Sequence, residues 1–161
     1  MVQDIVRELG YLTLGSRLKR IGERLQGQAQ ALLEESGIGV PSSYFPVLAA
    51  LDRLGPLSVG ELAEAVGVSQ PAVTRVLDKL ESEGLVKSNP PARDRRVRPI
   101  ALTRTGGKLV SRAKQSVWPK IEAAVADACA GATGPLLSQL AALEDALVAT
   151  PLNLRASRVP S

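Results

Sequence analysis

The stretch SQPAVTRVLDKLESEGLV, residues 69–86, has the hydrophobic pattern of a helix that buries one side. Its apolar residues recur at steps of three and four, at Val73, Val76, Leu77 and Leu80, which places them on one face. The opposite face is polar and carries a basic residue in its N-terminal half. This pattern predicts an amphipathic helix whose polar face remains open to a partner. The polar face consists of Pro71, Thr74, Arg75, Asp78 and Ser82.

A second helix is predicted immediately before this one. Ser58 and Glu61 have the spacing of a capping box, which opens a helix over residues 59–66. The turn over residues 65–69 contains Gly67 and is short enough to hold the two helices at a steep angle. The apolar faces of the two helices would then pack together, which is the arrangement of a helix-turn-helix. The face of the earlier helix consists of Leu62, Ala63 and Val66.

Downstream of these helices the apolar period changes to that of strands. Residues 85–88 and 97–102 are predicted as two short strands joined by a basic, turn-rich tip over residues 89–96. Between Lys87 and Lys114 the chain has nine basic residues and one acidic residue, although its net charge is only +4. Such localised positive charge is typical of a phosphate-binding surface. We therefore predict a mainly α (α+β) fold, a winged helix-turn-helix with a basic wing.

The segment before the helix-turn-helix is predicted to begin with one long helix over residues 5–35. Its apolar residues share one face, and four glycines lower its helix propensity, so it needs packing against another element to persist. A shorter helix over residues 43–54 follows, inside a winged region that we place at residues 36–103. The apolar face of the long helix consists of Leu14, Leu18, Ile21, Leu25 and Leu32.

Two further helices are expected after the winged region. The first begins at Arg104, ends near Gly131 and is kinked or interrupted at Pro119, because proline lacks the N–H that a helix interior needs. Thr103 can cap its N-terminus. The second covers residues 135–149 and has leucines at coiled-coil-like steps. These leucines are Leu136, Leu140, Leu143 and Leu147.

These elements predict a single chain, residues 1–161, with one winged region between two helical parts. We expect residues 1–35 and 104–149 to form dimerisation helices, because their apolar faces would be exposed in a monomer. The final residues, 150–161, are expected to be a disordered tail.

Composition excludes several classes of function. The chain has no histidine and one cysteine, Cys129, so the commonest general base, the commonest transition-metal ligand and an internal disulfide are all missing. We therefore expect no metal or other cofactor and no enzymatic activity. No apolar run reaches the length of a membrane span and the N-terminus lacks a signal-peptide pattern, so we expect a cytoplasmic protein with no membrane partner.

Two motifs resemble those of the MarR (multiple antibiotic resistance regulator) family. One is the stretch at residues 69–86, which contains the predicted helix to about Glu83, and the other is the wing sequence DRRVRPIALTRTG, residues 94–106. The resemblance extends over nearly the whole chain and implies a homodimer that binds double-stranded DNA at a pseudo-palindromic operator. The wing residues at matching spacing are Asp94, Arg96, Leu102, Thr103 and Gly106.

The helix pattern and the resemblance together indicate which residues contact DNA. Arg75 can bind guanine bidentately, Gln70 can read adenine, and a helix N-terminus favours a phosphate. The resemblance implies that Arg96 enters the minor groove at the wing tip while Asp94 orients its guanidinium. The candidate DNA-binding residues are Ser69, Gln70, Pro71, Thr74, Arg75, Lys79, Arg93, Asp94, Arg95, Arg96 and Arg98.

The resemblance also implies regulation by a small molecule. Many members release DNA when a small aromatic acid or another hydrophobic compound binds between the dimer helices and the winged domain. Tyr11, Tyr44, Phe45 and Trp118 could line such an effector pocket, and packing in the core or interface is the alternative role of each. The predicted function is a homodimeric, sequence-specific transcriptional repressor released by such an effector. The alternative is a winged-helix protein-interaction module, which the basic wing disfavours.

Overall fold

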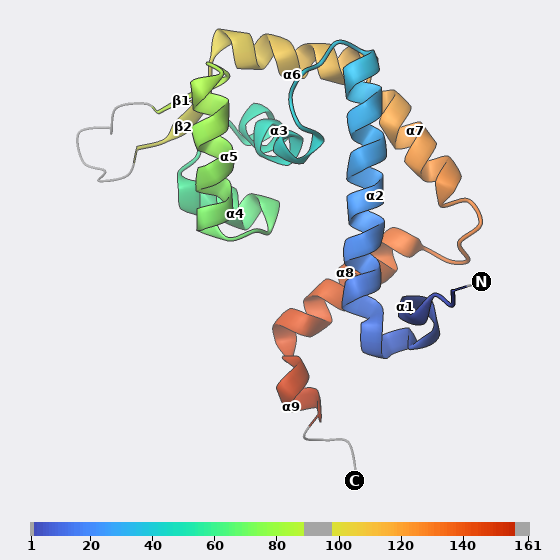
Figure 1. Cartoon of the computed structure of the whole chain (residues 1–161). Helices are drawn as coiled ribbons and strands as arrows, with labels where there is room; N and C mark the ends of the chain where they lie inside the picture. The colour runs from blue at the N-terminus through green and yellow to red at the C-terminus, as the bar shows by residue number, and fades with distance from the viewer. Residues whose placement is uncertain (1, 89–97, 157–161) are drawn as a thin grey trace. The chain divides into compact units, whose positions relative to one another are not determined.

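The computed structural model describes residues 2–88 and 98–156. The chain divides into two compact units, Met1–Ala123 and Ala124–Ser161, and each is described by itself. The first unit contains the long N-terminal helix, the helix-turn-helix and the sheet (Figure 1). The described part of the second unit is formed by helices and the turns between them.

Helices α3 (Phe45–Leu54), α4 (Val59–Val66) and α5 (Gln70–Ser82) form the helix-turn-helix and the helix that supports it. The predicted capping box opens α4. The Glu61 backbone N–H donates to Ser58 Oγ at 3.2 Å, and the Ser58 backbone N–H donates to Glu61 Oε2 at 2.8 Å. Gly67 ends α4 in the left-handed region, at a φ of 71°. The predicted helices are confirmed here, but the Ser69 side chain makes no capping hydrogen bond to α5.

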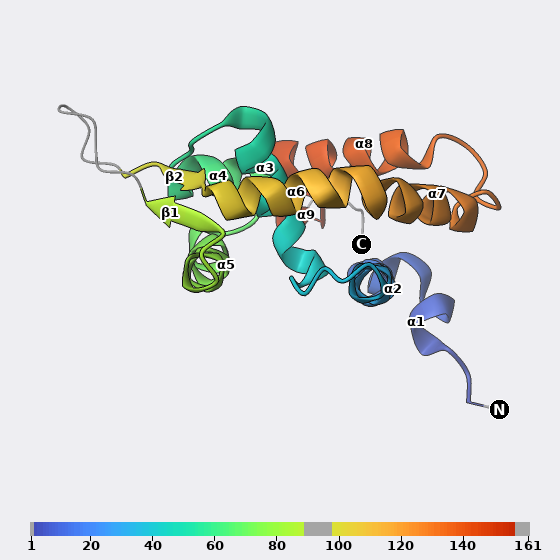
Figure 2. The same cartoon turned by 90° about the horizontal axis from the view of Figure 1, so that it is seen from above.

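The contact between α4 and α5 is the one that the sequence predicts. Leu62 of α4 and Val73 and Leu80 of α5 are fully buried, and Val66 and Val76 pack against the same core. In the view from above, α5 is seen along its axis, whereas α6 (Arg104–Ser116) runs across the view (Figure 2). The apolar face of α5 is therefore fixed inward.

The wing is a two-stranded antiparallel sheet of β1 (Val86–Ser88) and β2 (Ile100–Leu102). Val86 pairs with Leu102 and Ser88 with Ile100. The other edge of β2 bonds to Leu57, two residues before α4. The Leu57 N–H donates to the Ile100 carbonyl at 3.0 Å, and the Ile100 N–H donates to the Leu57 carbonyl at 2.7 Å. The first predicted strand is confirmed, and the second begins at Ile100 rather than at Val97, which lies outside the described residues.

The start of α6 is attached to the turn between α5 and β1. Thr103 caps α6 by accepting a hydrogen bond from the Gly106 backbone N–H at 3.0 Å, and its hydroxyl donates to the Gly84 carbonyl at 2.6 Å. A Cβ at Gly106 would lie 2.0 Å from the carbonyl oxygen of Leu85, well inside van der Waals contact. Only glycine therefore fits at this position.

The helix expected to begin at Arg104 is interrupted, as the sequence predicts, but before the proline. Helix α6 ends at Ser116 and α7 (Trp118–Ala128) begins after Val117. Pro119 is the second residue of α7, where the missing N–H would have no partner within the helix. The interruption therefore precedes the proline by two residues, and α7 ends before Gly131.

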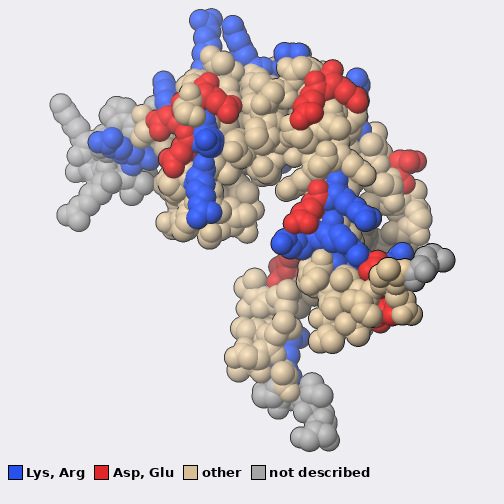
Figure 3. All heavy atoms as spheres, viewed as in Figure 1, with Lys and Arg blue, Asp and Glu red and all other residues tan. Residues whose placement is uncertain are grey.

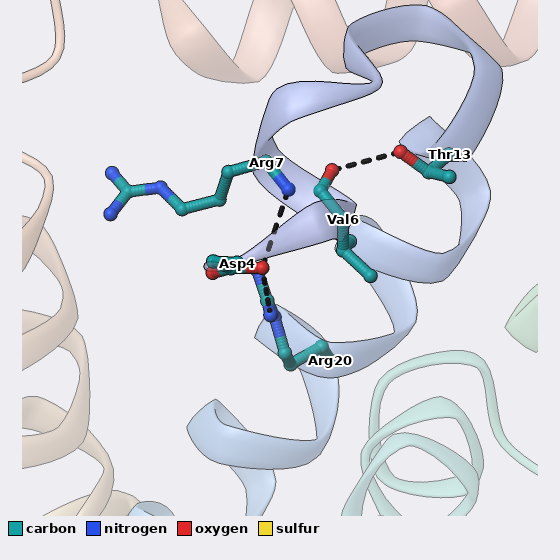
Figure 4. A network of polar contacts seen from close by, with 5 residues as sticks. All are labelled: Asp4, Val6, Arg7, Thr13 and Arg20. Carbon is teal, nitrogen blue, oxygen red and sulfur yellow. Dashed lines mark hydrogen bonds and ion pairs between the residues drawn. The ribbon is translucent and has the colours of Figure 1, made fainter. Parts of the chain in front are cut away.

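The expectation of one continuous helix over residues 5–35 is wrong for residues 5–13. The chain forms a short α1 (Ile5–Glu8), a 3-10 turn (Gly10–Thr13) and then α2 (Leu14–Glu35). Gly10 has a φ of 55°, in the left-handed region that ends a helix. The Thr13 hydroxyl donates to the Val6 carbonyl at 2.8 Å and holds the reversal (Figure 4).

Asp4 joins this short helix to α2. Its Oδ1 accepts hydrogen bonds from Arg20 Nη1 at 3.0 Å and from the Arg7 backbone N–H at 3.3 Å (Figure 4). The hydrogen bond from Arg20 lowers the pKa of the Asp4 carboxyl below its ordinary value of 3.8. The N-terminal segment is therefore folded back by polar contacts on the surface, since α1 contains no buried residue.

The second unit contains the end of α7, α8 (Leu136–Ala149) and a short α9 (Leu152–Ala156). The expected helix over residues 135–149 is confirmed. The expectation of a disordered tail is wrong for residues 152–156, because these form α9. Arg155 of α9 donates to the carbonyls of Thr150 and Ala146 at the end of α8, which attaches α9 to that end.

Candidate nucleic-acid interface

The outer face of α5 is exposed along its length. Pro71, Thr74, Arg75, Asp78, Lys79 and Ser82 are all exposed, whereas Val73, Leu77 and Leu80 on the opposite face are buried. Rotating the helix about its axis would expose these three apolar side chains. The fold therefore presents the polar face that the sequence assigned to DNA. Its basic residues, Arg75 and Lys79, form no salt bridge within residues 2–88 and 98–156.

Thr74 and Gln70 are less available to bases than Arg75. The Thr74 hydroxyl donates to the Gln70 carbonyl one turn earlier, at 3.0 Å, so its methyl group and oxygen lone pairs remain for a ligand. The Gln70 side chain lies over the start of α4, where its Nε2 is 3.5 Å from the position that a Cβ on Gly60 would take. Arg75, in contrast, is exposed, and its side chain has no hydrogen bond or salt bridge within the described residues.

Gln70 shares a surface hollow with the base of the wing. The hollow has a volume of about 560 Å³ and lies between the start of α4, the start of α5 and the sheet. Arg98 and Ser88 line it from the wing, and Ser58 and Gly60 line it from α4. The structure thus brings Gln70 and Arg98 together. Arg93, Asp94, Arg95 and Arg96, the other predicted wing residues, lie outside the described residues, so their DNA contacts stay predictions.

Charge is uneven along α5. Figure 3 shows basic side chains over α5 and beside the wing, with acidic side chains next to those of α5. Arg75 and Lys79 supply the basic groups, while Asp78, Glu81 and Glu83 lie at the same level of the helix or beyond it toward its C-terminus. The N-terminal end of a helix also carries the positive end of its dipole. The positive potential of this face is therefore strongest toward the start of α5.

A separate cavity lies among α2, α3 and the start of α7. Its volume is about 350 Å³, and its wall includes Phe45 and Trp118, whose rings meet edge to face with centroids 5.7 Å apart. Of the four aromatic residues assigned to an effector pocket, these two are in the wall. Tyr44 packs partly buried against the core, and Tyr11 is 94% exposed and lies outside the cavity.

Comparisons with known proteins agree with this geometry. The family model described as "MarR family" matches residues 38–97, from the loop before α3 into the wing. The HTH-type transcriptional repressor MdtR of Bacillus subtilis is 35% identical over 89 residues, which are 55% of this chain and 56% of MdtR. The match thus spans little more than half the length of that relative. A MarR family transcriptional regulator from Silicibacter pomeroyi is 27% identical in solved structure, with a TM-score of 0.59, over 83% of this chain and 87% of the other. Residues 38–97 thus match the MarR family, and the chain is similar in sequence and fold to MarR family regulators.

The fold agrees with the MarR family beyond the matched segment. The crystal structure of MepR from S. aureus with DNA superposes with a TM-score of 0.66, covering 84% of this chain and 97% of MepR, at 22% identity. The family's wing motif also has a physical reason here. Thr103 caps α6 and Gly106 lies against the Leu85 carbonyl, so the Leu-Thr-x-x-Gly spacing attaches α6 to the end of the helix-turn-helix.

Of the residues in the cavity wall, only Phe45 and Trp118 were predicted from the sequence. Beside the two aromatic residues, the wall is made of small and apolar side chains from helices far apart in the chain. Ala29 and Ala49 leave the space, and a pair of alanines on opposite helices has no signature in a single sequence. The remaining wall residues are Leu33, Ser42, Pro46 and Ile121.

Metal binding and membrane spanning both have no structural support among the described residues. Within residues 2–88 and 98–156, no three His, Cys, Asp or Glu side chains are grouped so that they could hold a metal ion. No helix in the described part of the chain is both long and apolar enough to cross a membrane.

Proposed function

We propose that this chain is a homodimeric, sequence-specific DNA-binding repressor of transcription of the MarR family. The observation that carries the proposal is the exposed polar and basic face of α5, held outward by the buried residues on its opposite face. A helix presented in this way can enter the major groove, where base edges are read. Relatives support the proposal, since MdtR is named a transcriptional repressor and MepR has been solved with DNA.

In the proposed complex α5 reads bases and the wing contacts the adjacent backbone and minor groove. Arg75 donates to a guanine, as its exposed position on α5 permits. Arg98 and Gln70 meet phosphates around the hollow at the start of α4, and Arg96 enters the minor groove at the wing tip. Phosphate contacts fix the orientation of the protein, and base contacts supply specificity.

The dimer is supported by apolar surface that one chain leaves uncovered. Leu18, Ile21 and Leu25 on one face of α2 are each more than a third exposed, and Tyr11 and Leu12 are almost fully exposed. In the second unit Leu137 and Val148 are more than four-fifths exposed. Contiguous apolar surface of this kind marks an association surface. A second copy would cover it and set the separation of two half-sites.

Regulation by a small hydrophobic effector is part of the proposal. The cavity between α2, α3 and α7 supports it, because α3 packs directly against the core of the winged region. A ligand held there contacts both the arm helix α2 and the helix that supports α4 and α5. It can therefore change the position of α5 relative to DNA.

Selection of binding sites from randomised duplex DNA tests this function. We expect wild-type protein to select a pseudo-palindromic motif. Arg75→Ala should lose preference at one position of each half-site, at a cost of about 1–3 kcal/mol per half-site. Arg53→Ala, an exposed arginine at the end of α3, is the matched control and should select the wild-type motif.

Two results would contradict the proposal in different ways. If wild-type and Arg75→Ala proteins select one motif with equal stringency, Arg75 is not a reader. If the wild-type protein selects no motif and does not bind duplex DNA, the regulator function fails and a protein-interaction module takes its place.

A further inference from the structure

The wall of the cavity beside Trp118 is almost wholly apolar. Ala29 and Leu33 come from α2, Ala49 from α3, and Ile121 from α7. None of the described residues in the wall carries a charge. The polar groups of the wall are the Ser42 hydroxyl and the Trp118 indole. A ligand there has no cation to pair with.

The polar groups of Ser42 are already engaged. Its hydroxyl donates to the Gln26 carbonyl at 3.0 Å, and its backbone N–H donates to Gln30 Oε1 at 2.7 Å. These bonds leave Ser42 little capacity to donate to a carboxylate. The Trp118 indole has a single N–H, which cannot compensate the hydration that an anion loses on entering an apolar site.

The two basic residues in the C-terminal half of α6, Arg112 and Lys114, are engaged elsewhere. Arg112 Nη2 donates to the Ser36 carbonyl at 2.7 Å, and Lys114 Nζ forms a salt bridge with Asp52 at 2.6 Å. Lys120 of α7 lies between two wall residues in sequence but is itself exposed and outside the wall. An anion that packs against this wall gives up part of its hydration without gaining such a partner, so the wall disfavours anionic ligands.

We infer that this cavity binds an uncharged aromatic molecule and discriminates against a carboxylate or sulfonate of the same shape. This inference rests on the proposed function in taking the ligand as the effector. An apolar cavity of about 150 Å³ can hold benzene, so a volume of about 350 Å³ has room for two or three aromatic rings. The edge-to-face pair of Phe45 and Trp118 offers ring surfaces for further aromatic contacts.

The only tryptophan of the chain lies in this wall, which allows a direct binding test. The probes are N-phenyl-1-naphthylamine, which is neutral, and 8-anilinonaphthalene-1-sulfonate, which has the same ring skeleton with an added sulfonate. Each is titrated into the full chain while Trp118 emission and energy transfer to the probe are recorded. We expect the neutral probe to quench Trp118 and to bind at least about tenfold more tightly, a difference equivalent to about 1.4 kcal/mol.

Substitutions at Ala49 and Ala65 locate the probe, and a third at Ala29 tests the charge preference. Ala49→Phe fills the cavity and should abolish the energy transfer, whereas Ala65→Phe, at an exposed position of α4, should leave it unchanged. Ala29→Arg places a cation in the wall and should reverse the preference in favour of the sulfonate. Circular dichroism of each variant verifies that it is folded.

Probe binding tests this inference, and DNA binding tests the proposed function. The inference fails if the sulfonate binds as tightly as the neutral probe, if the neutral probe does not quench Trp118, or if folded Ala49→Phe binds it unchanged. Fluorescence anisotropy with labelled duplex DNA is recorded in parallel. A neutral probe that binds in the cavity and leaves DNA affinity unchanged overturns the effector role. Failure to bind DNA at all overturns the regulator function, whereas the measured charge preference remains valid.

Discussion

The winged region, which in the structure includes α6 as well as residues 36–103, and the helical arms differ in where their apolar side chains lie. Every buried apolar residue in the described part of the chain lies between Leu33 and Val117. The arms, α1, α8 and α9 together with the exposed face of α2, bury almost nothing by themselves. The winged region therefore contains the interactions needed for its own stability. The arms have helical patterns whose apolar faces still lack a partner within one chain.

This difference separates the part of the fold that one chain stabilises by itself from the part that it does not. Burial of apolar side chains is the main favourable term in folding. The winged region gains this term within one chain, so its geometry does not depend on concentration. In the proposed dimer the arms would gain it by association, so we expect their order to depend on how much of the protein is paired.

The largest expected effect comes from the close approach of Gly106 to the Leu85 carbonyl. Gly106→Ala places a Cβ against the Leu85 carbonyl, and we expect it to destabilise the protein by at least about 3 kcal/mol. Gly107→Ala, next in the same helix, meets no atom within 4 Å and should stabilise it by up to about 1 kcal/mol. Urea denaturation of the two variants measures both effects. Equal stabilities would show that the α6 attachment is not rigid.

The second effect should be confined to the arms. Leu140→Lys combined with Leu143→Lys puts two charges into the apolar face of α8, and we expect the dimer to dissociate. Light scattering should give about twice the chain mass of 16.9 kDa for wild type and about one chain mass for the variant. Ser138→Lys with Ala142→Lys, at exposed positions of the same helix away from both the leucine face and the face of Leu137 and Val148, should remain dimeric. A wild-type protein that is monomeric at micromolar concentration would contradict the dimer.

A smaller effect should come from the bond between α2 and the winged region. Arg112 donates to the Ser36 carbonyl at the end of α2, and Arg112→Met removes this charge-assisted hydrogen bond. We expect a loss of about 1 kcal/mol, because the arginine is exposed. Lys108→Met, an exposed basic residue of the same helix, is the control and should leave the melting temperature unchanged. An equal change in both variants would show that the net charge of α6, and not this bond, is responsible.

The smallest effect should be local to the N-terminal segment. Because folding lowers the pKa of Asp4, its pairing with Arg20 stabilises the folded segment above pH 3.8 and is lost as the pH falls through the lowered pKa. Asp4→Asn should therefore speed amide exchange in α1 a few-fold at neutral pH, without changing global stability. Glu8→Gln removes a charge from the same helix and should leave this exchange unchanged. A wild-type exchange rate that matches Asp4→Asn at neutral pH would refute the contribution of the pair.

The sequence was sufficient where a few neighbouring residues determine the backbone. Ser58 with Glu61 and Thr103 with Gly106 each bond across three residues, so their spacing predicts the helix starts directly. Gly67 likewise ends α4 at the predicted place. These local signals, with the apolar periodicity between them, were enough to predict the helix-turn-helix and the wing.

Features that depend on contacts distant in sequence were missed. The reversal at Gly10 is held by the pair of Asp4 and Arg20, sixteen residues apart, and one glycine among four in the segment gave no sign of it. The position of the Gln70 side chain over Gly60 of the preceding helix likewise had no signal in the sequence, and its base contact stays a prediction. The cavity arises where Ala29 and Ala49 face it from different helices. None of these arrangements follows from the periodicity of a single helix.

The backbone pairing of Leu57 with Ile100 has a consequence for the DNA sites that this protein can use. Two hydrogen bonds join the base of the wing to Leu57, the residue before the capping box of α4. The wing and α5 are therefore held at a fixed distance and orientation within one protomer. In the proposed complex, the number of base pairs between the bases under α5 and the minor groove under the wing is therefore a constant of the protomer. The number of base pairs between two half-sites is set instead by the arms. Changes in the arms could then alter operator spacing without altering the sequence read in each half-site.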